Sequence, residues 1–209
     1  GVQTCALPIF SPEIINRENS VISPFDSLFK VVADEFDLDW LMLTAIAAQE
    51  SKFDPSSVSW MGAVGLMQVL PRFSEISEDS LMIAEVSARE GAKIMKDHLA
   101  HYAYMDTTNQ WKFALATYNA GLGHLADARR LSIDRNKNPN EWSNISDSLL
   151  KLMQRRYYQN ARYGFCRGIE TIRYVNEITN RYETYLAILE ANEVRNDGLP
   201  GIMGIKTLN

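Results

Sequence analysis

The stretch that decides the fold is "WLMLTAIAAQESKFDPSSVSWMGAVGLMQ", residues 40–68. Its first half is apolar with helical spacing, and Leu43, Ile46 and Glu50 share one face at i, i+3 and i+7. This register places an ionisable carboxyl on the face that packs into the core. In a structural interpretation Glu50 turns to solvent or pairs with Lys52, whereas in a functional interpretation it acts as an acid.

Burial and helix position predict the same direction for the pKa of Glu50. Desolvation disfavours the carboxylate, and the negative end of the helix dipole does so too, because Glu50 lies in the last turn. Both effects raise the pKa. A carboxylic acid that stays protonated near neutral pH is suited to protonating a glycosidic oxygen.

The composition is typical of a soluble globular protein. Of 209 residues, 46% are hydrophobic and 22% are charged, and this length is suited to a single domain. A net charge of −5 lacks the basic surface needed to bind many phosphates, which argues against nucleic acid as a partner. The Arg- and Tyr-rich residues 154–167 do not require RNA binding, because a solvated helix face or a surface for a polar ligand explains them at least as well. No apolar run approaches the roughly 20 residues that cross a bilayer.

Helical spacing dominates the chain and strand signals are scarce, so we predict an all-α fold. The first helix has Ser23 as a candidate N-cap and Pro24 at its first position, and Gly121 is well placed to end a later helix. We expect helices at about 23–36, 39–51, 80–105, 109–121, 122–132 and 168–190, with a short helical turn within 64–70.

The chain divides into three segments. Residues 23–190 contain no internal repeat or linker, and we expect one catalytic domain there. We expect residues 1–22 to be unstructured or artefactual, because the first ten resemble translated sequencing-adapter text and lack the features of a signal peptide. The Gly-rich residues 191–209 are expected to form a loose tail.

Two further stretches supply polar groups in an aromatic setting. They are "GLMQ", which ends at Gln68, and "TYNAG", which contains Tyr118 and Asn119. A saccharide site needs a few hydrogen-bonding groups and flat apolar surfaces for pyranose rings, and Trp60 is a further residue of the right type. Each signal is weak alone, and the ordered set is stronger.

The ordered motifs resemble the catalytic domain of soluble lytic transglycosylases, the SLT family. The resemblance covers about residues 23–187, and Gln68 follows Glu50 at the spacing of that family. It implies a lysozyme-like fold related to goose-type lysozyme. The three stretches that carry it are "QESKFDPSSVSWMGAVGLMQVLP" at 49–71, "ATYNAG" at 116–121 and "RGIETIRYVNEI" at 167–178.

The resemblance implies a role for each matched residue. Glu50 would be the sole catalytic acid and base, and Ser59 would contact the N-acetyl group of a sugar. Other matched residues would support Glu50 and form the cleft, and the alternative for Met67 and Tyr174 is that they are ordinary core residues. The expected substrate-binding set is Ser59, Met67, Gln68, Tyr118, Asn119, Glu170 and Tyr174.

The implied reaction cleaves peptidoglycan between N-acetylmuramic acid and N-acetylglucosamine without water, leaving a 1,6-anhydromuramoyl end. Two alternatives stay open. One is a lysozyme-type hydrolase, which needs a second carboxylate about 5 to 9.5 Å away, and Asp54 is the nearest candidate in sequence. Its setting before Pro55 favours a turn residue instead. The other is a catalytically silent peptidoglycan-binding module.

No cofactor or metal is expected. His98 and His101 lack a third ligand, and the segment from Asp134 has neither the Gly nor the final Glu of a calcium loop. Cys5 and Cys166 are too few for a disulfide framework.

The family resemblance also implies the partners and the cellular location. It indicates glycan strands as the partner, a monomer, and a periplasmic location. Some members of the family carry a solute-binding-like domain ahead of the catalytic one. Outer-membrane association through such a missing N-terminal region is left open.

Overall fold

The computed structural model describes residues 21–197, and within them every regular element is helical, which confirms the all-α prediction. Two isolated β-bridges, which link Val64 to Val58 and to Val69, are the extended pairings found in this part of the chain. The elements are α1 (Asp26–Phe36), α2 (Trp40–Glu50), a 3-10 turn (Pro71–Phe73), α3 (Glu78–Leu81), α4 (Ala84–His101), α5 (Thr107–Ala120), α6 (Leu122–Asp134), α7 (Trp142–Lys151), α8 (Arg155–Tyr158) and α9 (Gly168–Asp197).

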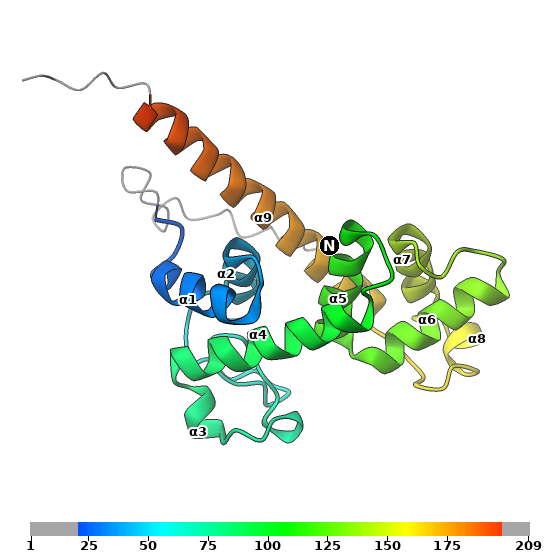
Figure 1. Ribbon diagram of the computed structural model, residues 1–209. Coiled ribbons are helices and arrows are strands. Elements are labelled where there is room, and N and C mark those ends of the chain that lie inside the picture. The colour runs from blue at the N-terminus through cyan, green and yellow to red at the C-terminus, as the bar shows by residue number, and fades with distance from the viewer. Residues whose placement is uncertain (1–20, 198–209) are drawn as a thin grey trace, which may run out of the picture.

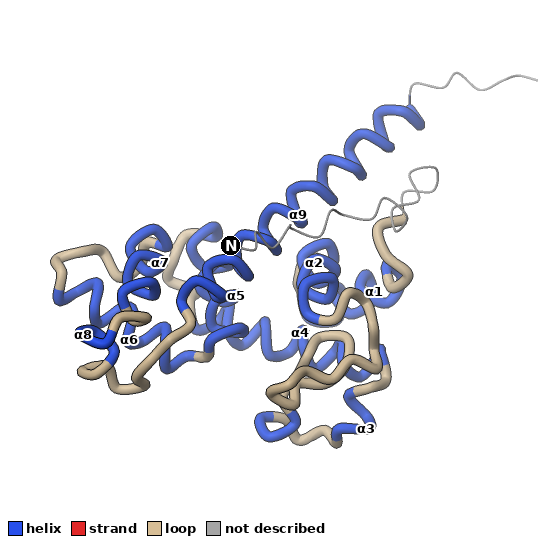
Figure 2. The backbone as a smooth tube through the Cα atoms, turned by 180° about the vertical axis from the view of Figure 1, so that it is seen from behind, coloured by secondary structure: helices blue, strands red, loops and turns tan. Residues whose placement is uncertain are grey.

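The helices form two groups that α4, α5 and α9 connect (Figure 1). One group contains α1, α2 and α3 with the long loop after α2, and the other contains α6, α7 and α8. Figure 2 shows the same arrangement from behind, with the long loop drawn in tan beneath α2. Helix α9 packs on α2, α5 and α7, and its C-terminal half extends away from the other helices.

Polar contacts at both ends of α2 attach it to α9. At the start of α2, the Asp39 side chain caps the helix by accepting from the N–H groups of Leu41 and Met42, and it also accepts from the Tyr182 hydroxyl at 2.7 Å. At the other end, Tyr174 of α9 donates to Glu50. Because Tyr174 precedes Tyr182 while Glu50 follows Asp39, the two helices run antiparallel, and their register is set by these contacts.

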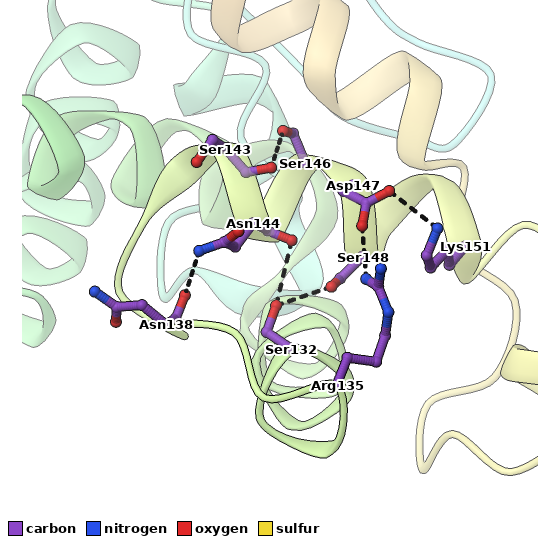
Figure 3. Close-up of polar contacts among 9 residues, drawn as sticks. All are labelled: Ser132, Arg135, Asn138, Ser143, Asn144, Ser146, Asp147, Ser148 and Lys151. Carbon is purple, nitrogen blue, oxygen red and sulfur yellow. Dashed lines mark hydrogen bonds and ion pairs between the residues drawn. The ribbon is translucent and has the colours of Figure 1, made fainter.

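The second group of helices has its own polar network, drawn in Figure 3. The hydroxyl groups of Ser132 and Ser148 lie 2.8 Å apart between α6 and α7, and both residues are buried. Asp147 binds Arg135, the residue that follows α6, at 2.6 Å and Lys151 of its own helix at 3.0 Å. These contacts fix α7, an element that the sequence analysis did not anticipate.

The start of α1 differs from the prediction. Ser23 and Pro24 precede the helix, which begins at Asp26 after a non-helical Phe25. The Asp26 carboxylate explains the shift, because it accepts hydrogen bonds from the Ser23 N–H and hydroxyl and from the Ile22 N–H. The Asp26 side chain therefore closes a turn with residues 22 and 23, and Ser23 does not act as the N-cap of α1.

Three other boundaries also differ from the prediction. The stretch 64–70 forms a tight turn between β-bridges instead of a helical turn. The expected helix at 80–105 is split into α3 and α4, since Leu81 ends the first piece and its carbonyl oxygen lies close to Gly65. Helix α9 continues to Asp197 rather than ending near residue 190. Cys5 and the remainder of the expected N- and C-terminal segments lie outside the described residues.

Candidate active site

Glu50 is the last residue of α2, and the chain reverses direction immediately after it. Lys52 and Phe53 both have positive φ angles, 55° and 66°, which non-glycine residues seldom adopt. The buried Ser51 hydroxyl donates to the Leu66 carbonyl at 2.8 Å and holds the returning loop against the helix end. The carboxyl is thus presented at a sharp, well-braced turn.

The Glu50 carboxyl is partly buried and has one side-chain hydrogen bond, which the hydroxyl of Tyr174 donates to its Oε1 at 2.5 Å. Burial raises the pKa of Glu50 from an ordinary 4.5 to about 7, while the bond from Tyr174 lowers it by a smaller amount. The desolvation effect expected from the helical register is therefore present. With this pKa, both the protonated and the ionised forms of the carboxyl are populated at neutral pH. A side chain with both forms available can act first as a general acid and then as a general base.

Tyr118 of α5 lies near the acid. Its hydroxyl donates to the Met67 carbonyl at 2.8 Å and so ties α5 to the loop after α2. Burial raises its pKa well above the ordinary value, and the charges of Glu50 and Glu90 act in the same direction. The acid is therefore flanked by two phenols, Tyr118 and Tyr174, that remain neutral and can donate hydrogen bonds.

Gln68 and Ser59 shape the loop that faces the acid. The Gln68 side-chain N–H group donates to the carbonyls of Ser57 and Gly65, both at 2.9 Å, and its own φ of 50° closes the turn. The Ser59 oxygen accepts from the Ala63 N–H at 3.0 Å, which leaves its O–H available as a donor. The amide nitrogen of Gln68 therefore stabilises the loop, and its side-chain oxygen has no hydrogen bond among the described contacts.

Met67 lies in the core rather than on an exposed cleft wall. Its side chain is fully buried and packs on Gly91 of α4, where an added Cβ would lie 2.6 Å from the Met67 Cβ. The absent side chain of Gly91 is what permits this approach. Of the two interpretations left open for Met67, the structure matches the core residue, and its contribution to the site is the carbonyl that Tyr118 binds.

Of the remaining expected residues, two are exposed to solvent and one is buried. Asn119 is exposed on α5 next to Tyr118, and Glu170 is exposed in the first turn of α9. Glu170 pairs with Arg167 at 3.5 Å, and Arg167 in turn lies over the ring of Trp60. Tyr174 is buried, yet its hydroxyl reaches Glu50, so it is both a core residue and a contact of the acid.

Asp54 is poorly placed to activate water for hydrolysis. Its exposed carboxylate accepts hydrogen bonds from the Ser56 N–H at 2.9 Å and the Ser56 hydroxyl at 2.7 Å. These bonds lower its pKa and stabilise a turn before Pro55. The turn interpretation matches the structure.

Sequence reasoning missed two groups that hold the site together. Gln49 accepts from Arg181 at 3.0 Å and donates to Glu177 at 2.8 Å, so the residue beside the acid is clamped to α9. Buried Asp127 of α6 accepts the N–H groups of Arg162 and Tyr163 and fixes the loop before α9. The spacing of Glu177 and Arg181 at i, i+4 hinted at a shared face, whereas nothing local marked Asp127.

The part of the chain that the structure describes contains neither a metal-binding cluster nor a membrane-spanning helix. No cluster of three or more His, Cys, Asp or Glu side chains is arranged to hold a metal ion there. Nor does any described helix combine the length and the apolar character needed to span a membrane.

The fold and the site together define a class of protein. The model of the transglycosylase SLT domain family matches residues 27–141, more than half of the chain, and the chain belongs to this family. Its fold is similar to that of the 70 kDa soluble lytic transglycosylase from Escherichia coli, with a TM-score of 0.54, 22% identity and coverage of 77% of this chain and 24% of that one. An inactive mutant of lytic transglycosylase Slt from Pseudomonas aeruginosa gives the same TM-score with 21% identity, over 82% of this chain and 26% of that one. The fold is thus lysozyme-like, as expected.

The similar full-length relatives are membrane-bound lytic murein transglycosylases F. The protein from Photobacterium profundum is 33% identical over 193 residues, which are 90% of this chain and 37% of the relative. The one from Shewanella loihica is 39% identical over 164 residues, 77% of this chain and 34% of the relative. This chain therefore spans about a third of the length of the curated relatives it matches.

Proposed function

We propose that this chain is a peptidoglycan lytic transglycosylase, in which Glu50 acts as general acid and then as general base. The observation that carries the proposal is the partly buried Glu50 carboxyl, whose pKa is raised to about 7 and whose Oε1 is bonded by Tyr174. The names of its relatives support murein as the substrate class.

In the first step, protonated Glu50 donates its proton to the oxygen that links N-acetylmuramic acid to N-acetylglucosamine. Because Tyr174 occupies Oε1, the proton resides on Oε2, the oxygen without a protein hydrogen bond among the described contacts. The bond between the muramoyl C1 and this oxygen breaks as the proton arrives. Participation by the 2-acetamido group of the muramoyl residue stabilises the positive charge at C1.

In the second step, Glu50 is ionised and takes the proton of the muramoyl C6 hydroxyl, whose oxygen bonds to C1. One carbon–oxygen bond has formed and one has broken, no water is consumed, and Glu50 is again protonated. The hydrogen bond from Tyr174 stabilises the carboxylate between the two steps, which is why it lowers the pKa that burial raises.

The residues around the acid have distinct roles in this proposal. The Ser59 hydroxyl donates to the N-acetyl group of the sugar, and the exposed Asn119 amide contacts the saccharide from α5. Gln68 and Tyr118 maintain the shape of the loop, and the Gln68 side-chain oxygen accepts from the glycan. Exposed Glu170 forms part of the opposite wall.

The decisive experiment is mass spectrometry of the muropeptides that the protein releases from purified peptidoglycan. A lytic transglycosylase gives 1,6-anhydro ends, which are lighter by one water than reducing ends, and Glu50→Gln gives none. Reducing ends from the wild-type protein would indicate hydrolysis instead. Saturable binding of glycan with no product, even at high protein concentration, would indicate a silent binding module.

The location and assembly of the protein belong to the same proposal. A murein substrate implies the periplasm, and the relatives are named as membrane-bound. We propose that the active unit is a monomer, because acid, phenols and loop all come from one chain.

A further inference from the structure

Trp60 and Arg167 meet at the edge of the candidate site. The guanidinium carbon of Arg167 lies 5.3 Å from the centre of the Trp60 ring, a distance typical of a cation–π contact. Trp60 is 79% exposed and the Arg167 side chain is 56% exposed, so the pair stands in solvent. The nearest carboxylate contact of Arg167 is Glu170 at 3.5 Å, at the outer limit of a hydrogen bond, so an external carboxylate can replace it.

The backbone on the Trp60 side of the pair is ordered by hydrogen bonds. The Ser59 N–H donates to the Ala63 carbonyl at 2.8 Å, and the Ala63 N–H donates to the Ser59 hydroxyl at 3.0 Å. The Gly62 N–H adds a bond to the Ser59 carbonyl at 2.9 Å. Trp60 therefore projects from a closed turn and not from a loose loop.

The backbone on the Arg167 side is anchored by packing. Cys166 is buried, and its N–H donates to the Leu152 carbonyl at 3.4 Å. Gly168 lies so close to Leu149 that an added Cβ would be 2.2 Å from the Leu149 carbonyl oxygen. With both neighbours fixed, the backbone of Arg167 is held in place before any ligand binds, which lowers the entropy lost on binding.

The pair lies beside the acid but does not touch it. Arg167 directly precedes α9, and Tyr174 lies seven residues further along the chain, a separation of about 10 Å along the helix axis. Tyr174 contacts Glu50, and Trp60 lies on the loop that begins at Glu50. A group bound by Arg167 is therefore a substituent of the glycan and not the bond that is cleaved.

We infer that Arg167, which lies over the Trp60 ring, recognises a carboxylate of the stem peptide carried by a muramoyl residue of the substrate. The inference rests on the proposed function and extends it to substrate preference. The planar guanidinium carries N–H donors in a fixed fork that matches the two oxygens of a carboxylate. The contact with the Trp60 ring leaves these donors free for a ligand.

The test is a binding measurement that needs no turnover. Glu50→Gln protein is titrated by calorimetry with soluble glycan oligomers whose stem peptides have free carboxyl groups, and with the same oligomers after conversion of these groups to amides. We expect about tenfold tighter binding of the free-carboxyl form, the lower end for a charge-assisted hydrogen bond because the site is exposed. Adding Arg167→Ala abolishes the difference, and Arg167→Lys retains only part of it, since lysine keeps the charge without the planar donors.

Arg89→Ala is the matched control, because Arg89 also forms an exposed pair with a glutamate, Glu35, at 2.9 Å. This variant keeps the full preference. Trp60→Ala reduces the preference and Trp60→Phe retains most of it. Equal binding of the two oligomers, binding of neither, or a preference that survives Arg167→Ala would overturn the inference. Absence of anhydro products from the wild-type protein would contradict the proposed reaction alone, because the binding assay does not depend on it.

Discussion

The hydroxyl of Tyr174 donates a 2.5 Å hydrogen bond to Oε1 of Glu50, which joins α9 to the last turn of α2. This contact links the fold to the chemistry. Burial makes the carboxyl a weak acid, and the phenol keeps it ionisable while directing its proton to the other oxygen. Gln49 repeats the same helix pairing through Glu177 and Arg181, so the acid is positioned by two contacts across one interface.

Tyr174→Phe is expected to move the pH dependence of cleavage. The first step needs protonated Glu50, so kcat/KM falls as pH rises through its pKa of about 7. The lost hydrogen bond had lowered this pKa, so in the variant the pKa rises and the descending limb shifts to higher pH. Turnover also falls by about tenfold because the carboxyl is less well oriented. A pH–rate profile of both proteins tests this, and a limb that stays in place would contradict it.

Glu50→Gln is expected to change how stability depends on pH. The folded-state pKa of about 7 lies above the ordinary 4.5, so the contribution of Glu50 to stability is fully present below pH 4.5 and is lost as pH rises through 7. The glutamine variant lacks this loss and is more stable than the wild type at pH 8 by up to about 3 kcal/mol. Urea unfolding at pH 4 and pH 8 measures the difference. Exposed Glu183→Gln is the control: it keeps Glu50 and is expected to lose stability between pH 4 and pH 8 as the wild type does.

Gly91→Ala is expected to destabilise the protein by about 1 to 3 kcal/mol, because the new methyl group collides with Met67. Helix propensity alone predicts the opposite sign, a gain of up to about 1 kcal/mol. Chemical denaturation distinguishes the two. In a Met67→Gly background the same substitution should cost less, since the Cβ and Cγ atoms that the new methyl group would meet at 2.6 and 2.7 Å are absent. Equal costs in both backgrounds would rule out the collision.

Asp127→Ala is expected to loosen the loop before α9. The buried carboxylate accepts from the N–H groups of Arg162 and Tyr163 and also pairs with Arg130, so its removal costs about 2 to 4 kcal/mol. Limited proteolysis should then cut near residues 159–165 in the variant. Exposed Asp134→Ala, on the same helix, is the control and leaves this loop resistant. Resistance in both variants would show that other contacts hold the loop.

The sequence predicted those features that depend on one helix alone, such as its register and its end. The register at Leu43, Ile46 and Glu50 predicted an acid on a buried face, and the rise in its pKa follows from that burial. The helix ending at Gly121 was also predicted, because glycine readily adopts the φ of 85° found there. Helical periodicity and caps are properties of neighbouring residues, so they can be read without the rest of the molecule.

Long-range contacts explain the features that the sequence did not reveal. The burial of Met67 depends on Gly91, and the break between α3 and α4 accompanies the close approach of Leu81 to Gly65. The two backbone N–H groups that Asp127 accepts belong to residues more than 30 positions away along the chain. The Tyr174 contact was expected only through the family resemblance. Which face of one helix meets which face of another depends on side-chain packing and hydrogen bonding across the whole core, and these interactions exist only once the chain has folded.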